Sequence, residues 1–167
     1  MGIRITGLAG EMKRIKAEIR DHTMIVKKLV GIAVKSAVQV GMSRTPVFSG
    51  EAVRNYKVGV GSIPSRTSLP VQGRVAWPPS GPLPPDTQNE QRRGANEAAV
   101  MAEVSAKMQG FASMRKMPDI VAIKNTSDIA DLIENGSAPT AERSRYAGGV
   151  SILMRNTLIR SSKGTIS

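Results

Sequence analysis

The sequence contains no cysteine and only one histidine, His22. Without cysteine the chain forms no disulfide and offers no thiolate to a metal, and one imidazole cannot make a histidine-based metal site within a single chain. The absence of thiols suits either a reducing compartment such as the cytoplasm or a protein that is indifferent to redox state. His22 falls on the apolar face of an expected helix, which favours a core or interface role over general base catalysis.

Aromatic residues make up 3% of the 167 residues. A core must therefore use aliphatic side chains and methionine, and contacts between subunits would add to the burial. A chain of this length fits one domain, which buries roughly two thirds of the surface that the unfolded chain exposes. The sequence has neither an apolar run of about 18 residues nor the pattern of a secretory signal, so we expect no membrane span and no export by the usual route.

Positive charge is in excess, with 24 Lys and Arg against 13 Asp and Glu and a formal net charge of +11. Two interpretations stay open: a cationic surface that keeps the protein soluble, or a nucleic-acid or acidic-protein partner. Basic pairs such as Lys27-Lys28 and Arg92-Arg93 have no aromatic residues among them. They therefore suit contact with phosphate or an acidic surface and do not suit base stacking.

Apolar residues recur every seven positions near the N-terminus, at Ile5, Met12, Ile19, Val26, Ala33 and Val40, with Leu8, Ile15 and Leu29 three residues further on. This spacing predicts a long helix over residues 5–43, or two helices with a break near residues 21–23. Unbroken, such a helix is about 50 Å long, more than a small domain covers. We expect Met12, Ile19 and Val26 to pack partly on the chain's own sheet and partly on a neighbouring subunit.

The helix repeat stops at a Pro and Gly corner. Pro46 lacks an N–H and pushes Thr45 out of the helical region, so the helix should end near Thr45. Gly50 helps to form the turn that follows. After it, Tyr56, Val58 and Val60 alternate with Lys57 and Gly59, which predicts a half-buried strand.

A Pro-rich arm is expected over residues 62–86, because its many prolines exclude a helix or a central strand. Trp77 in this arm is either an anchor on another surface or a cover for the chain's own core. Beyond it, a capping box at Thr87 and Glu90 predicts a helix whose stripe includes Met101, Val104, Met108 and Phe111.

Three shorter elements should complete the domain. We expect a buried strand over residues 119–124 and a short helix over residues 128–133, capped by Thr126 or Ser127 and closed by Asn135-Gly136. A final helix follows over residues 146–159. The prediction is thus one α+β domain over residues 1–160, with a small, mainly antiparallel sheet and two or three further helices, and a flexible tail over residues 161–167.

The sequence shows no catalytic constellation. Asp128, Asp131 and Glu134 lie three residues apart and would share one side of a helix. They form either a solvated face or a cation site completed by other subunits. We expect no enzyme activity and no cofactor; a metal-dependent enzyme using these acids is kept as an alternative.

The segment Thr45-Pro-Val-Phe-Ser-Gly50 and the following Arg54-Asn-Tyr-Lys57 resemble a signature of the neck and tail-completion proteins of tailed double-stranded-DNA bacteriophages. Those proteins show a long helix, a TPVDTG turn and RANW at the start of a strand. Here Phe48 and Ser49 replace Asp and Thr, and Tyr56 replaces Trp.

A second signature of that family is a strand ending in Asn, a YAxxLExG helix and SxQAPxGM. It is similar to Ile123-Lys-Asn125, Ile129-Ala-Asp-Leu-Ile-Glu-Asn-Gly136 and Ser137-Ala-Pro139, with Met154 in the closing helix. The two signatures come in the family's order and span most of the chain.

The resemblance implies a structural virion protein that forms a ring, commonly a hexamer, in the neck or at the head-proximal end of the tail. Such a ring would bind itself, the connector and the tail tube, and would contact passing DNA without sequence preference. It would assemble in the host cytoplasm. The residues expected at subunit or partner interfaces are Met12, Ile19, Val26, Pro46, Gly50, Arg54, Tyr56, Trp77, Glu134 and Gly136. The alternative is a basic, DNA-binding architectural protein.

Overall fold

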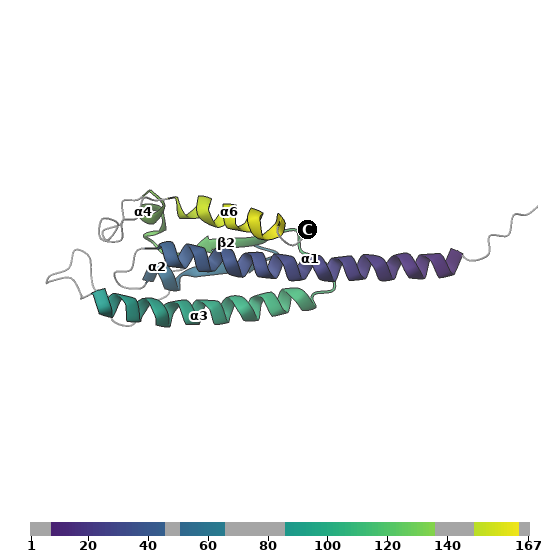
Figure 1. The fold of residues 1–167 in the computed structure, drawn as a ribbon, viewed down its shortest axis with the longest axis horizontal. Helices are drawn as coiled ribbons and strands as arrows, with labels where there is room; N and C mark the ends of the chain where they lie inside the picture. The colour runs from purple at the N-terminus through teal and green to yellow at the C-terminus, as the bar shows by residue number, and fades with distance from the viewer. Residues whose placement is uncertain (1–7, 46–50, 66–85, 136–148, 164–167) are drawn as a thin grey trace, which may run out of the picture.

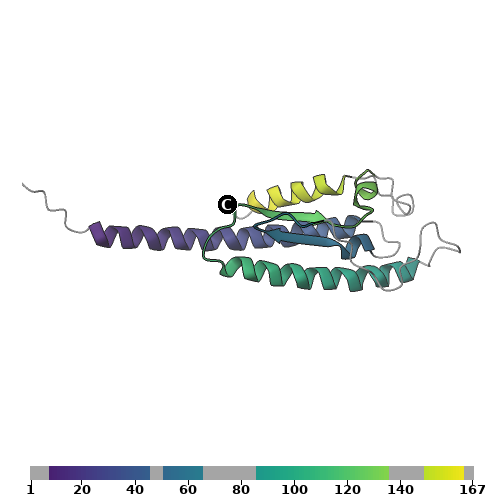
Figure 2. The same ribbon diagram turned by 180° about the vertical axis from the view of Figure 1, so that it is seen from behind.

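The computed structural model describes residues 8–45, 51–65, 86–135 and 149–163. In chain order the elements are α1 (Leu8–Arg44), α2 (Glu51–Arg54), β1 (Tyr56–Val60), α3 (Asp86–Ser113), β2 (Val121–Asn125), α4 (Ala130–Glu134) and α6 (Val150–Lys163). This is the expected α+β class with a long N-terminal helix and an antiparallel sheet. In Figures 1 and 2, α3 and α6 lie on opposite sides of α1, and the strands of the sheet run beside the C-terminal half of α1.

α1 is one continuous helix of 37 residues. The break considered near residues 21–23 does not occur. The Thr23 hydroxyl donates to the Ile19 carbonyl at 2.7 Å, a bond that threonine makes inside a helix. α1 ends at Arg44, directly before Thr45, as the corner with Pro46 predicts.

The sheet has two antiparallel strands, with Tyr56 opposite Asn125 and Val60 opposite Val121. β1 has the predicted bounds, and its Tyr56 and Val58 side chains are buried. β2 begins two residues later than expected and is half-buried throughout, not buried. Among the described residues β2 pairs with β1 alone, so its second edge has no strand beside it to cover it.

The later helices differ from the predictions mainly at their ends. α3 begins at Asp86, which was predicted to be the last residue of the Pro-rich arm, so Thr87 lies inside the first turn of α3 and not at the cap. α4 begins at Ala130 after Ile129, without a side-chain cap; the Ser127 hydroxyl instead accepts the Ile129 N–H in the preceding turn, at 3.3 Å.

α6 extends further than predicted, to Lys163, and thus into the segment expected to be a flexible tail. Its basic C-terminal turn, which includes Arg160, favours this continuation because cations stabilise the carbonyl end of a helix. Gly149, with a φ of +71°, precedes α6. The segments 66–85 and 136–148, and Pro46 and Gly50, lie outside the described residues, and with them Trp77 and Gly136.

The core lies between the C-terminal half of α1, α2, α3, the sheet and α6. Its residues are mainly aliphatic, as the low aromatic content implies: Val34, Ala37, Val38, Met42, Ala52, Val53, Tyr56, Val58, Val100, Val104, Met108, Phe111, Ile133, Val150 and Met154. The helix stripe predicted for α3 is buried at Val104, Met108 and Phe111. The core therefore holds only one end of α1.

Candidate interaction surface

The N-terminal half of α1 extends beyond the other helices and strands that the structure describes. None of residues 9–26 is buried, and only Ala17 and Thr23 are partly covered. In both ribbon views this part of α1 runs past the ends of α3 and α6 (Figures 1 and 2). Tertiary contacts within the subunit therefore do little to stabilise this half.

An apolar stripe runs along this free half. Its members are Met12, Ile15, Ile19 and Val26, with side chains 49%, 50%, 60% and 44% exposed. At about 100° per residue all four fall within roughly 60° of one another around the helix. We call them the α1 stripe.

The same helix face continues into the core. Ala33 and Ala37 lie on the line of the α1 stripe, and they are 6% and 0% exposed. The predicted seven-residue pattern therefore divides in two. α6 and α3 cover its C-terminal part, whereas among the described residues nothing buries its N-terminal part.

A largely apolar cavity of about 750 Å³ lies where the stripe enters the body of the subunit. Its walls come from α1, α6, β2, Phe111 and residues 117–119. Val26 lines one end of it, while Met117 and Ile159, also in the lining, are 41% and 42% exposed. We call this feature the α6 groove. The apolar surface thus continues from the α1 stripe into the α6 groove.

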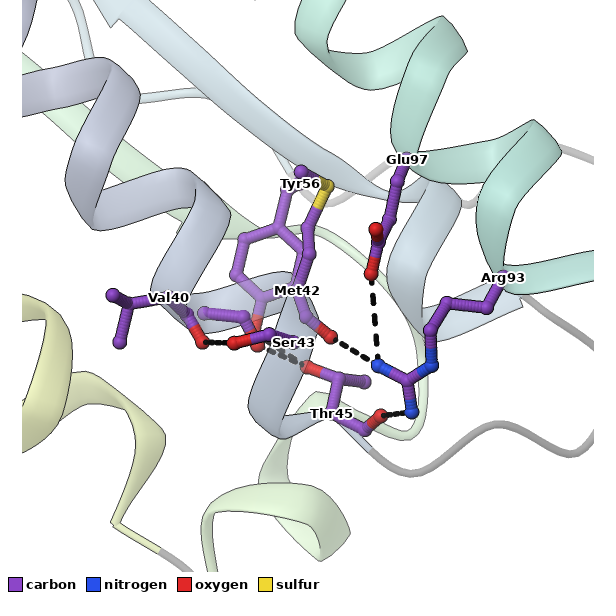
Figure 3. A network of polar contacts seen from close by, with 8 residues as sticks. Val40, Met42, Ser43, Thr45, Tyr56, Arg93 and Glu97 are labelled. Atoms are coloured by element: carbon purple, nitrogen blue, oxygen red, sulfur yellow. Dashed lines mark hydrogen bonds and ion pairs between the residues drawn. The ribbon is translucent and has the colours of Figure 1, made fainter. Parts of the chain in front are cut away.

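The C-terminus of α1 is fixed by a polar network. Arg93 of α3 donates to the carbonyl oxygens of Met42 at 2.9 Å and Thr45 at 3.1 Å (Figure 3). Thr45 Oγ1 donates to the Gly41 carbonyl at 2.7 Å and lies 2.8 Å from the hydroxyl of Tyr56. A cation that binds the last carbonyls of a helix also interacts favourably with the helix dipole. This corner therefore holds the C-terminal end of α1 against α3 and β1.

Tyr56 is only 3% exposed, and burial raises the pKa of its phenol above the ordinary value. Arg54 donates to the Glu103 carboxylate, which also accepts from Lys57 at 2.7 Å. The hydrogen bond from Arg54 holds the pKa of Glu103 below its usual value. Arg54 and Tyr56 thus make contacts within their own subunit, and their predicted interface role stays a prediction.

Glu134 connects α4 to the start of α6. Its carbonyl accepts the Gly149 N–H at 2.9 Å, and its carboxylate accepts the Ser151 N–H at 3.1 Å. A carboxylate at a helix N-terminus is stabilising because it meets the positive end of the dipole. The interface role of Glu134 is also still a prediction.

The acidic row considered for a cation does not share one helix, since α4 begins at Ala130 and Asp128 precedes it. In the part of the chain that the structure describes, no group of three His, Asp or Glu side chains is placed to hold a metal ion. The helices within the described ranges include none that is both long and apolar enough to cross a membrane.

The sequence patterns indicated the α1 stripe but neither the α6 groove nor the role of Arg93. The groove combines residues from three distant parts of the sequence, and Arg93 had no signal beyond its basic neighbour. In comparisons with known proteins, no protein-family model, curated protein or solved structure matches the chain.

Proposed function

We propose that this chain is a structural virion protein that forms a ring in the neck, or at the head-proximal end of the tail, of a tailed double-stranded-DNA bacteriophage. In this role it joins the tail to the head connector and performs no catalysis. The observation that carries the proposal is the exposed α1 stripe. A subunit that presents a continuous apolar helix face outside its own core is suited to assembly with other chains.

The positions of the two signatures support the proposal. The first covers the corner between α1 and β1, and the second runs from β2 into α4. They meet at one end of the sheet, where Thr126 donates its N–H to the Asn55 carbonyl at 2.9 Å and the Asn125 amide donates to the Ala52 carbonyl at 3.0 Å. Segments some 70 residues apart in the sequence thus form one structural unit, as motifs of a shared fold should.

The positive charge has two uses in such a ring. Basic side chains on the inner surface would contact the DNA that passes through, while those on the outer surfaces would face an acidic connector. Both contacts are electrostatic and need no base recognition. A formal charge of +11 suits either one.

Native mass spectrometry with negative-stain imaging of the purified chain tests the proposal. The oligomeric state would be measured at several protein concentrations. We expect closed rings that all contain the same number of subunits. A monomer at all concentrations, with no affinity for tail or connector proteins, would contradict it. If that monomer instead bound duplex DNA with an affinity that falls steeply with salt, the architectural DNA-binding role would take its place.

A further inference from the structure

We propose that the α1 stripe of one subunit packs into the α6 groove of a second copy of the chain. This inference rests on the proposed ring and names the two surfaces that join its subunits. Each subunit would offer its own stripe to one neighbour and its own groove to the other.

The two surfaces match in character and size. Met12, Ile15 and Ile19 follow the i, i+3, i+7 spacing by which an amphipathic helix inserts anchors into an apolar groove. The free half of α1, residues 9–26, is about 27 Å long and can therefore reach beyond its own subunit. The groove, at about 750 Å³ with an exposed apolar rim, has room for several large side chains.

Charges beside the two surfaces are complementary. By helical position, Glu11 and Glu18 flank the stripe on one side, and Lys16 and Arg20 flank it on the other. The groove's lining brings one charge of each sign, Arg155 from α6 and Asp119 from the segment before β2.

These charges would orient the incoming helix. The acidic flank of the stripe would face Arg155, and its basic flank would face Asp119. Reversing the helix would exchange its two flanks, so these pairs would favour one direction of the helix in the groove.

The acidic side chains that flank the stripe can replace their ion pairs within the subunit by ion pairs with a neighbouring subunit. Within the subunit Glu11 and Glu18 meet only Arg14 among the described ion pairs, at 3.6 Å each, with all three side chains more than half exposed. Exposed pairs of this kind contribute little stability, so they offer little resistance to a new pairing with a neighbour.

The symmetry of the stripe-to-groove contact is also the symmetry that a ring requires. Stripe and groove are different surfaces of one chain, so the interface is heterologous, and repeating it builds a ring where the rotation closes. A stripe that packed against a second stripe would instead give an isologous dimer and leave the groove empty of protein.

Cysteine cross-linking tests the contact directly, because the chain has no cysteine of its own. The double variant Ile15→Cys/Ile159→Cys places one thiol on the stripe and one on the groove rim. Under mild oxidation we expect a ladder of covalent multimers that ends at the ring's copy number. Each single variant should remain uncross-linked. Dimers of the Ile15→Cys variant alone would show stripe against stripe and overturn the inference.

A complementation experiment with charged variants provides the second test. Ile19→Glu damages the stripe and Ile159→Glu the groove, and each alone should weaken self-association at least about tenfold. Mixed together, the two variants should form heterodimers, because each retains one intact surface. Ile25→Glu is the matched control: Ile25 is 54% exposed, close to the 60% of Ile19, but lies on another face of α1. Unchanged circular dichroism and unfolding curves would show that the variants fold.

The outcomes separate this inference from the proposed function. Rings that form without the stripe-to-groove cross-link, or that tolerate both Glu variants, overturn the inference and leave the ring proposal intact. Cross-linked multimers that bind neither tails nor connectors support the inference and contradict the phage role.

Discussion

Among the glycines of α1 that the structure describes, Gly41 lies nearest to side chains of other elements. A Cβ atom added there would lie 2.7 Å from Sδ of Met154 and 2.9 Å from Cε1 of Tyr56, closer than real Cβ atoms come. The Tyr56 ring has little freedom to move, because it is buried and its hydroxyl is hydrogen-bonded to Thr45. Met154 must therefore shift within the core, where it is 8% exposed.

Two opposing terms set the size of the effect of Gly41→Ala. Alanine in a helix interior is favoured over glycine by about 1 kcal/mol, whereas overpacking a core costs about 1–3 kcal/mol. We expect a net loss of up to about 2 kcal/mol in the free energy of unfolding. Gly110 in α3 has nothing within 4 Å of an added Cβ, so Gly110→Ala should gain up to about 1 kcal/mol.

Urea unfolding followed by circular dichroism measures both variants. Both glycine variants would be made in a protein that also carries Ile19→Glu, which weakens self-association. Otherwise association would raise the apparent free energy of unfolding. The midpoints should move in opposite directions with unchanged slopes. If Gly41→Ala stabilised the protein as much as Gly110→Ala, the tight packing of α1 against α6 and β1 would be refuted.

Three further predictions concern polar groups. Arg93→Met removes two charged hydrogen bonds and should cost about 2–3 kcal/mol in unfolding free energy. Arg14→Met is the control, and because the partners of Arg14 are exposed it should cost less than about 1 kcal/mol. Equal losses in urea titrations would contradict the stabilising role of Arg93 at the C-terminus of α1. The raised pKa of Tyr56 means that its contribution to stability is complete below pH 10.0 and is lost as pH rises through the folded-state value. Tyr56→Phe should therefore cost about 1 kcal/mol at pH 7 and unfold less steeply with alkali, and a wild-type alkaline profile in the variant would count against this. Glu103 has a lowered pKa, so its contribution to stability is present above pH 4.5 and fades as pH falls. Because the side chain is 45% exposed, Glu103→Gln should cost less than about 1 kcal/mol at pH 7. A larger loss would show that the ion pairs of Glu103 with Arg54 and Lys57 contribute more than a surface contact does.

Local signals predicted the helix, the corner and the first strand. Pro46 ends α1 whatever surrounds it, and the alternation after it fixes β1 at Tyr56–Val60. α2 was missed because four residues carry no periodic pattern. It forms where Ala52 and Val53, 3% and 0% exposed, enter the core beside α3.

The candidate site was only half predictable. The seven-residue repeat of α1 does not change at the point where α3 and α6 stop covering the helix. That point depends on where α3 and α6 end in space, which the repeat itself does not encode. The groove needs Val26, Met117 and Ile159 to meet, and no local pattern joins residues so far apart. The predicted stripe was thus real, but its free and covered parts required the fold.

Binding of the purified chain to isolated tails tests the central claim most directly. Under the proposed function the chain is a phage protein, so tails of that phage, prepared without the protein, would be incubated with it and imaged by electron microscopy. The account predicts one ring at the head-proximal end of each tail, and a marked loss of rings with Ile19→Glu but not with Ile25→Glu. Tails that remain bare while the protein stays monomeric would contradict it.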